Sequence, residues 1–257
     1  MALATIVALI YVFLFTPIVT VIVLSFGQSI SVISLSRLTT RWYAQLANND
    51  EAIAAFWFSL RLGLASAVLA LTIGTMAAFG IVRQRFRGKW LLQAMLFSPM
   101  VVPEIIIAVA LLSFFAFLRI PRGWPALVIG HTVLLLPYVI SVVSAKLYGF
   151  DRSLEEAAQN LGAPRWRSFI EVTLPLMAPA MVGAALIAFK VSFDEVVGSV
   201  FWSSLRERTL PVVVFAMLNW ELTPQVNAIG TLMTAVTLAI LAVFQLTSLR
   251  RQRSSRN

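Results

Sequence analysis

Six long apolar runs make up most of this chain, and each is long enough to cross a bilayer as a helix. They cover residues 3–26, 56–82, 91–118, 124–145, 175–200 and 226–249. A helix rises 1.5 Å per residue, so about 20 apolar residues span a hydrocarbon core of about 30 Å. Only 12% of the residues are charged, whereas a soluble domain carries about 25%. The sequence therefore predicts an all-α integral membrane protein with about six transmembrane helices in one domain, residues 1–257.

Composition excludes several kinds of site. The chain contains no cysteine, so it has no disulfide, thiolate ligand or thiol nucleophile. Its single histidine, His131, excludes a site with several histidine ligands, and we expect no metal site. A net charge of +9 would favour nucleic acid as the partner of a soluble protein. Here the basic residues cluster between apolar runs, as topology signals do, so we expect membrane lipid and no nucleic acid.

The distribution of Lys and Arg predicts the orientation. Twelve of the twenty basic residues fall after the second run, after the fourth run and in the tail, which lie on one side if there are six crossings. The opposite loops hold six. Basic residues are enriched in cytoplasmic loops, so we expect a multi-pass protein of the bacterial cytoplasmic membrane. Both the N- and C-termini are predicted to be cytoplasmic.

The cytoplasmic loop of about residues 151–171 is the most informative segment. Asp151 or Ser153 can cap a short helix there. Glu155 and Glu156 then stand in its first turn, where the helix dipole favours negative charge. We therefore expect a short helix at the start of this loop.

The same loop contains signals that end this helix. Gly162 permits a left-handed residue, and Pro164 prevents continuation. A second short helix, from about Pro164 to Glu171, is expected to lead into the fifth apolar run. Two short helices at a turn suit a knob that fits a partner's groove, and they suit a plain amphipathic loop equally well.

A known sequence pattern favours the interpretation that this loop docks into a partner's groove. Glu156-Ala157-Ala158-x-x-x-Gly162, followed nine residues later by Val172-x-Leu174-Pro175, resembles the EAA loop of ABC-importer permeases, with valine in place of the usual isoleucine. In that family this loop is a coupling helix, which docks into a cleft on a cytoplasmic ATPase. The resemblance implies that ATPase coupling falls to Glu155, Glu156, Ala157, Ala158, Gly162, Ala163, Leu174 and Pro175.

Most of the remaining chain is similar to the spermidine/putrescine-type permeases. Residues 130–132, 136–138, 193–197 and 224–228 carry that similarity. It implies a type I ABC importer permease fold and a role in moving a small organic solute, with polyamines such as spermidine or putrescine favoured. Opines, amino-acid derivatives and aminophosphonates are the alternatives. The implied partners are a second homologous permease, two ATP-binding subunits and an extracytoplasmic solute-binding protein.

The chain is not expected to be an enzyme or to hold a cofactor. Gly88-Lys89 is the nearest approach to a Walker A loop, but Trp90 stands where Ser or Thr should bind magnesium. No glycine lies five residues before Gly88. ATP and Mg²⁺ are therefore expected on a partner ATPase. The rival classes are an ATP-independent secondary transporter, which needs no such docking loop, and a membrane enzyme, which needs a clustered catalytic set.

Three carboxylates lie within the apolar runs, where charge is costly and usually faces a cavity or a partner. Glu104 follows two prolines, and Asp194 and Glu195 lie towards the outer end of the fifth run. The functional hypothesis is that Glu104 and Asp194 line the solute pathway and attract a cation, with Glu195 nearer its rim. The alternative for Asp194 is an ion pair with Lys190, four residues earlier on one helix face.

Aromatic side chains are the other candidates for the pathway, because they can stack on an ammonium group. The candidates near the external side are Trp57, Phe193, Trp202 and Trp220. Tryptophan is also the ordinary anchor at a membrane interface, which is the simpler interpretation. His131 is expected to be a helix-packing residue rather than a proton carrier.

Overall fold

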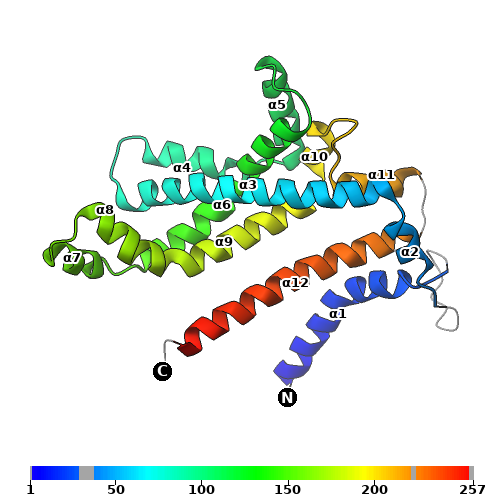
Figure 1. Cartoon of the computed structure of the whole chain (residues 1–257), viewed down its shortest axis with the longest axis horizontal. Coiled ribbons are helices and arrows are strands. Elements are labelled where there is room, and N and C mark those ends of the chain that lie inside the picture. Colours follow the sequence, from blue (N-terminus) through cyan, green and yellow to red (C-terminus); the bar gives the residue numbers. More distant parts are fainter. Residues whose placement is uncertain (1, 29–37, 221–223, 255–257) are drawn as a thin grey trace. The chain divides into compact units, whose positions relative to one another are not determined.

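The computed structural model describes residues 2–28, 38–220 and 224–254, and the side chains of Trp220 and of most residues beyond Ala239 lie outside the described part. The described residues are helical and contain no strand (Figure 1). Contacts divide the chain into two compact units, residues 1–57 with 212–257, and residues 58–211. The unit boundaries fall within α3 and α11, and the expectation of a single domain stays a prediction.

The first unit is built on three helices, α1 (Ala2–Leu24), α2 (Arg41–Ala47) and α12 (Gln225–Ser254). Helix α12 packs against both α1 and α2. Trp42 anchors α2, because its indole N–H donates to the carbonyl oxygen of Gly27 at 2.7 Å. Residues 3–19 of α1 are exposed, which is the surface expected of a helix that faces lipid or another membrane chain.

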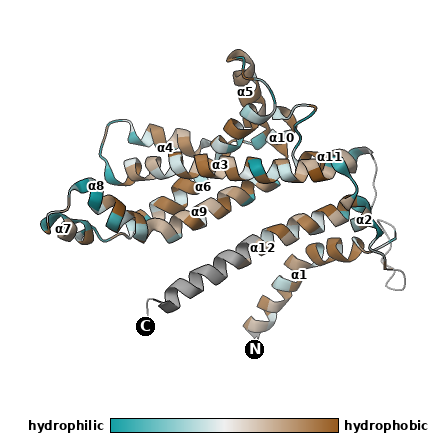
Figure 2. Ribbon diagram, viewed as in Figure 1, coloured by the Kyte–Doolittle hydropathy of each residue, from teal (hydrophilic) through white to brown (hydrophobic). Residues whose placement is uncertain are grey.

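The second unit contains the candidate site. Its elements are α3 (Asp50–Arg83), α4 (Lys89–Phe97), η1 (Ser98–Met100), α5 (Glu104–Phe117), α6 (Trp124–Tyr148), α7 (Ser153–Asn160), α8 (Arg165–Ser168), η2 (Phe169–Thr173), α9 (Leu174–Asp194) and α10 (Val197–Trp202), followed by the start of α11 (Leu210–Trp220). Helices α6 and α9 pack along one another, and α10 packs against α5. Apolar residues run along the long helices, while hydrophilic residues gather at α7, α8 and the turn after α3 (Figure 2).

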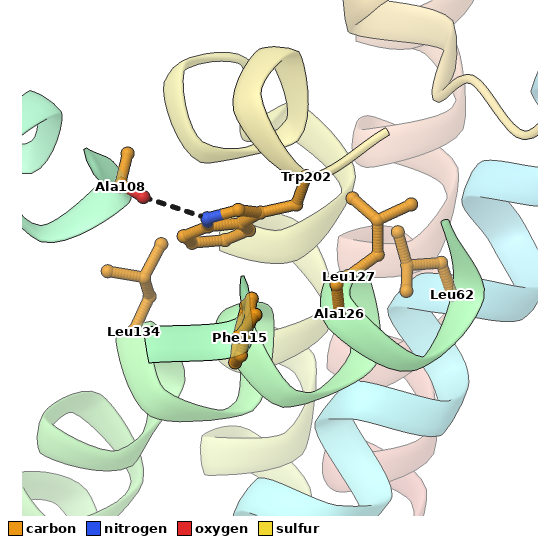
Figure 3. Packing of buried hydrophobic residues seen from close by; sticks show 7 residues of the cluster. All are labelled: Leu62, Ala108, Phe115, Ala126, Leu127, Leu134 and Trp202. Carbon is orange, nitrogen blue, oxygen red and sulfur yellow. Dashed lines mark hydrogen bonds between the residues drawn. The ribbon is translucent and has the colours of Figure 1, made fainter. Parts of the chain in front are cut away.

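Trp202 belongs to a packed hydrophobic cluster in this unit. Its side chain is fully buried, and its indole N–H donates to the carbonyl oxygen of Ala108 at 3.0 Å. Figure 3 shows the indole above Phe115, whose ring meets it edge-on at 6.2 Å between centroids. Lipid tails are as apolar as leucine, so membrane helices are held by close packing and hydrogen bonds rather than by escape from water. The cluster therefore fixes α10 to α5 by close packing against Phe115 and by the hydrogen bond to Ala108.

Among the described residues, four helices are long and apolar enough to cross a membrane, namely α1, α3, α6 and the continuous stretch Arg165–Asp194. The predicted runs 3–26, 56–82 and 124–145 thus correspond to α1, α3 and α6. The sixth predicted run, 226–249, falls in α12, of which residues Gln225–Ala239 are an apolar described part. These helices agree with the predicted all-helical membrane fold.

The prediction of one uninterrupted helix over residues 91–118 is wrong. Helices α4 and α5 are bent by 109° at the break between them, and together they pass as a fifth span. Pro103 precedes α5 with an extended backbone, φ −52° and ψ 130°. Proline lacks the N–H that would continue the helix, and the residue before it avoids helical geometry. Pro99 and Pro103 thus divide the run.

The prediction of one helix over residues 175–200 is also wrong. Helix α9 ends at Asp194, and Glu195 is extended with ψ 123° before the short helix α10 begins. At the other end, the second short helix expected from about Pro164 to Glu171 leads into the membrane helix, as predicted. Helix α8 passes through the π-helical turn η2 into α9. This turn carries the chain from the loop into the membrane helix without a break.

Candidate functional site

The loop predicted to be cytoplasmic forms the short helix expected from its sequence. Helix α7 begins at Ser153, and Glu155 and Glu156 lie in its first turn. The Asp151 carboxylate accepts a hydrogen bond from the Ser153 backbone N–H at 2.9 Å, which lowers the pKa of Asp151. We call residues 151–173 the elbow.

Gly162 ends α7 as predicted. Its φ is +91°, in the left-handed region that residues with a side chain rarely adopt. Its N–H donates to the carbonyl oxygen of Gln159 at 2.9 Å, and the N–H of Ala163 donates to that of Ala158 at 3.1 Å. These two bonds satisfy carbonyl groups that the helix end would leave unpaired. The chain then turns at Pro164 into α8.

The elbow exposes apolar side chains around this turn. Leu161 is 90% exposed and Trp166 is 66% exposed. Leu154, on the first turn of α7, is also exposed. Exposed apolar groups with a polar surround are a common mark of a protein interface. The sequence pattern alone does not indicate these three residues. Their exposure beside the Glu156–Gly162 pattern identifies them.

Glu155 behaves differently from its neighbour Glu156, which is exposed. The Glu155 carboxylate accepts two hydrogen bonds from the Arg83 guanidinium, at 2.7 and 3.1 Å, and one from the Thr173 hydroxyl. Burial favours the neutral carboxyl, but the hydrogen bonds from Arg83 and Thr173 and the charge of Arg83 outweigh it. The pKa of Glu155 is therefore lowered from its ordinary value of 4.5.

The remaining predicted coupling residues lie at the tip and at the base of the elbow. Ala157 and Gly162 are exposed, while Ala158 and Ala163 are half-buried. Leu174 and Pro175 begin α9, directly after the π-helical turn. The pattern thus joins the tip of the elbow to the start of a membrane helix, and the structure does not bring all of these residues into one surface.

The two broken helices form the second candidate region. Glu104 is the first residue of α5 and is exposed, directly after the 109° bend. Asp194 is the last residue of α9, and its carboxylate lies 3.0 Å from the Lys190 ammonium group. Both side chains of that pair are accessible, 53% for Lys190 and 37% for Asp194. The predicted alternative of an ion pair for Asp194 is therefore formed in this structure.

Glu195 is buried rather than exposed at a rim, with 6% of its surface accessible. Its carboxylate accepts hydrogen bonds from the backbone N–H of Gly198 at 2.6 Å and from that of Ser199 at 2.8 Å. It also lies within electrostatic range of Glu104. Glu195 thus caps the start of α10, and its role toward a solute stays a prediction.

His131 lies beside Glu195 with both ring nitrogens hydrogen-bonded. Nδ1 is 2.7 Å from the Ser192 hydroxyl, and Nε2 is 3.0 Å from the Ser199 hydroxyl. Nε2 is also 3.4 Å from the Glu195 carboxylate. This buried network joins α6, α9 and α10, which is the arrangement expected of a packing residue.

The predicted aromatic residues occupy different environments. Phe193 is 1% exposed and stacks on Phe189 at 5.6 Å between centroids. Trp202 is fully buried in the cluster of Figure 3. Trp57 belongs to the other unit and is 57% exposed, and the side chain of Trp220 lies outside the described residues. No solute contact follows from these positions alone.

The described residues contain no group of three His, Asp or Glu side chains placed to hold a metal ion. What they do contain is an elbow with an exposed apolar tip and acidic groups at the breaks of membrane helices. The fold and the site define a membrane transport permease.

Comparison with known proteins gives the family. The chain belongs to the family described as binding-protein-dependent transport system inner membrane component, whose model matches residues 70–247. It is 36% identical over 237 residues to the spermidine/putrescine transport system permease protein PotC of Haemophilus influenzae, covering 92% of each chain. It is 35% identical over 229 residues to the putrescine permease PotI of Escherichia coli K12, covering 86% of this chain and 82% of PotI.

Solved structures show the same fold. A bacterial alginate ABC transporter in complex with a pentasaccharide-bound periplasmic protein matches with a TM-score of 0.73 and 17% identity, over 97% of this chain and 93% of that one. The MetNI methionine ABC transporter in an inward-facing conformation matches with a TM-score of 0.61 and 18% identity, over 84% and 99%. The predicted type I ABC importer permease fold is confirmed.

Proposed function

We propose that this chain is the permease subunit of an ABC importer that carries polyamines such as spermidine or putrescine across the bacterial cytoplasmic membrane. ATP is bound, with Mg²⁺, and hydrolysed by a separate chain. The observation that carries this proposal is the elbow, in which Gly162 at φ +91° ends a short helix beside the exposed Leu161 and Trp166. The substrate class rests on the similarity to PotC and PotI.

The elbow docks on a cytoplasmic ATP-binding subunit. Leu154, Leu161 and Trp166 supply the apolar surface, and exposed Glu156 supplies a charge beside them. Apolar anchors of this kind provide most of the binding energy when they fill a partner's pocket. The small residues Ala157 and Ala158 leave room for the partner to approach the helix closely. Both termini then lie on the cytoplasmic side, in agreement with the distribution of basic residues.

The complete importer contains a second homologous permease, two ATP-binding subunits and an extracytoplasmic solute-binding protein. ATP binding closes the two ATP-binding subunits and draws the elbows together. Because α8 continues through η2 into α9, displacement of the elbow moves a membrane helix directly. The paired permeases then open outward, and hydrolysis resets them, as in a two-state equilibrium biased at one end by nucleotide.

Glu104 attracts the cationic solute as it passes. Its position at the start of a helix after a sharp break leaves the carboxylate exposed, and broken helices at membrane depth commonly surround transporter binding sites. Asp194 also lines the pathway, but Lys190 neutralises much of its charge. Glu195 and Phe193 are buried next to Asp194 in the sequence and are further candidates for this pathway. Trp57, in the other unit, is the aromatic candidate for contact with an ammonium group.

Uptake by the reconstituted complex tests this function. Vesicles that contain this chain with its partner permease and ATP-binding subunits are supplied with the solute-binding protein and radiolabelled putrescine or spermidine. We expect uptake that requires ATP on the cytoplasmic side and competition by unlabelled polyamine. Uptake driven by an ion gradient without ATP would contradict the ABC mechanism. Competition by opines, amino-acid derivatives or aminophosphonates, but not by polyamines, would overturn the substrate class alone.

A further inference from the structure

We propose that Arg83 is a positioning residue for energy coupling, which joins the elbow, α3 and the start of α9 into one rigid body. This inference rests on the proposed coupling role of the elbow and adds a residue from another helix to it. Arg83 is the last residue of α3 and is separated from Glu155 by 72 positions in the sequence.

The first connection is the two-pronged ion pair. Arg83 Nη2 donates to Glu155 Oε1 at 2.7 Å, and Nη1 donates to Oε2 at 3.1 Å. The two side chains are only 22% and 15% exposed. A parallel pair of bonds fixes both distance and orientation, which a single ammonium contact does not. The elbow is thereby fixed to the Arg83 end of α3, and Figure 1 shows α7 at that same end of the unit.

The second connection lies within the elbow and joins α7 to the segment that leads into α9. The Thr173 hydroxyl donates to the Glu155 carboxylate, and the Ser168 hydroxyl donates to the Glu155 backbone carbonyl at 3.3 Å. Both hydroxyl-bearing residues are buried; Ser168 is the last residue of α8, and Thr173 is the last residue of the π-helical turn η2. Glu155 therefore accepts hydrogen bonds from two different helical segments at once.

Aromatic rings surround the ion pair. The Arg83 guanidinium carbon lies 4.8 Å from the centroid of Phe79 and 5.6 Å from that of Phe150. Phe79 in turn meets Phe169 of η2 edge-on, at 5.3 Å between centroids. These rings restrict the guanidinium and limit its contact with water, which strengthens the ion pair relative to one in free solvent.

The two adjacent glutamates consequently have different tasks. Glu156 is exposed and available to a partner, whereas the carboxylate of Glu155 is already bound to Arg83 and Thr173. A displacement of the elbow is then transmitted to α3 and α9 together. Without Arg83, the elbow would remain joined to α9 through the backbone but would lose its connection to α3.

The test is the amount of solute imported per ATP hydrolysed by the reconstituted complex. Arg83→Ala should lower this ratio by roughly three- to tenfold, the range typical of mutations that weaken coupling between distant sites. Arg85→Ala is the matched control, because Arg85 is an exposed arginine two positions away, in the loop after α3. We expect it to keep the wild-type ratio.

A charge exchange guards against misfolding of the single variant. Either Arg83→Glu or Glu155→Arg alone should lower the amount of solute imported per ATP hydrolysed. The two substitutions combined should bring that amount back most of the way to the wild-type value. An unchanged ratio in Arg83→Ala would overturn the proposal. So would a proportional fall of import and hydrolysis, which indicates only fewer assembled complexes.

A distance measurement supplies an independent readout. The chain has no cysteine, so spin labels can be attached after the substitutions Gln84→Cys and Ser153→Cys. The label separation should be the same with and without nucleotide in the complex, and Arg83→Ala should make it vary. Variation in the otherwise wild-type chain would contradict a rigid connection.

Gly162→Asp separates failure of this inference from failure of the proposed function. If Gly162→Asp lowers the ratio and Arg83→Ala does not, only the role of Arg83 is wrong. If neither lowers it, the elbow does not couple, and both proposals fail.

Discussion

The indole of Trp202 lies directly against the backbone of Gly130. A Cβ atom added at Gly130 would come within 2.4 Å of Cζ3 of Trp202, closer than atoms can approach. Gly130 lies within the regular helix α6, so its backbone conformation does not require glycine. Glycine is required here because the Trp202 indole occupies the space of a Cβ atom. A Cβ atom added at Gly198 would likewise come within 2.4 Å of Cη2 of Trp202.

The first prediction follows from this contact. Gly130→Ala should destabilise the protein by about 1–3 kcal/mol, the usual cost of overpacking a filled core. Thermal unfolding of the purified protein in detergent measures the effect. Gly80→Ala is the control, because a Cβ atom at this helical position meets nothing within 4 Å. Equal melting temperatures for the two variants would contradict the packing described.

The second prediction concerns solute attraction. Glu104→Gln should lower the uptake of polyamine at saturating binding protein by about fivefold. This is the effect of losing one solvent-accessible contact between the Glu104 carboxylate and a solute ammonium group, worth up to about 1 kcal/mol. Membrane assembly should not change, because the Glu104 side chain is exposed. Uptake is normalised to the amount of complex in the membrane. A normalised rate equal to that of the wild type would make Glu104 a structural residue.

The third prediction compares the two carboxylates. Asp194→Asn should lower polyamine uptake less than Glu104→Gln does, because Lys190 at 3.0 Å already neutralises Asp194. The two variants are measured in the same vesicles assay. A larger loss in Asp194→Asn would show that the ion pair opens during transport and that Asp194 is the main acidic contact.

The fourth prediction concerns pH. The pKa of Glu155 is below its ordinary 4.5 in the folded protein, so its ionised form stabilises the fold above that value. This stabilisation is lost as the pH falls through the lowered pKa. The wild type should therefore lose more thermal stability than Glu155→Gln when the pH is lowered from 6 to below about 4.5. Parallel curves for both proteins would exclude a stabilising role for the charge.

Local signals in the sequence predicted the elbow well. Asp151 before α7, the two glutamates in its first turn and the glycine at its end act within a few residues of one another, although Arg152 and not Asp151 or Ser153 occupies the N-cap position. Gly162 accordingly adopts the left-handed conformation that its position predicts. The three uninterrupted helices α1, α3 and α6 also follow from apolar length alone.

The rest depended on contacts between distant parts of the chain. Nothing near Glu155 indicates that it binds Arg83 while Glu156 faces outward, because the two partners are 72 residues apart. The break at Glu195 was not predicted either, since apolar residues continue across it and the buried network around His131 stabilises the interruption. Pro99 and Pro103 marked the other break, but membrane helices often contain proline without a sharp bend.

The proposed coupling role of the elbow depends most on Gly162. Gly162→Asp in the reconstituted complex should leave assembly and ATP hydrolysis in place and reduce polyamine import per ATP hydrolysed by about tenfold or more. Gly88→Asp is the matched control, because Gly88 also has a positive φ, +83°, and open space around it, but lies in the turn after α3. The wild-type ratio in Gly88→Asp with a collapsed ratio in Gly162→Asp is the predicted result. A wild-type ratio in Gly162→Asp at normal assembly would contradict the coupling role of the elbow.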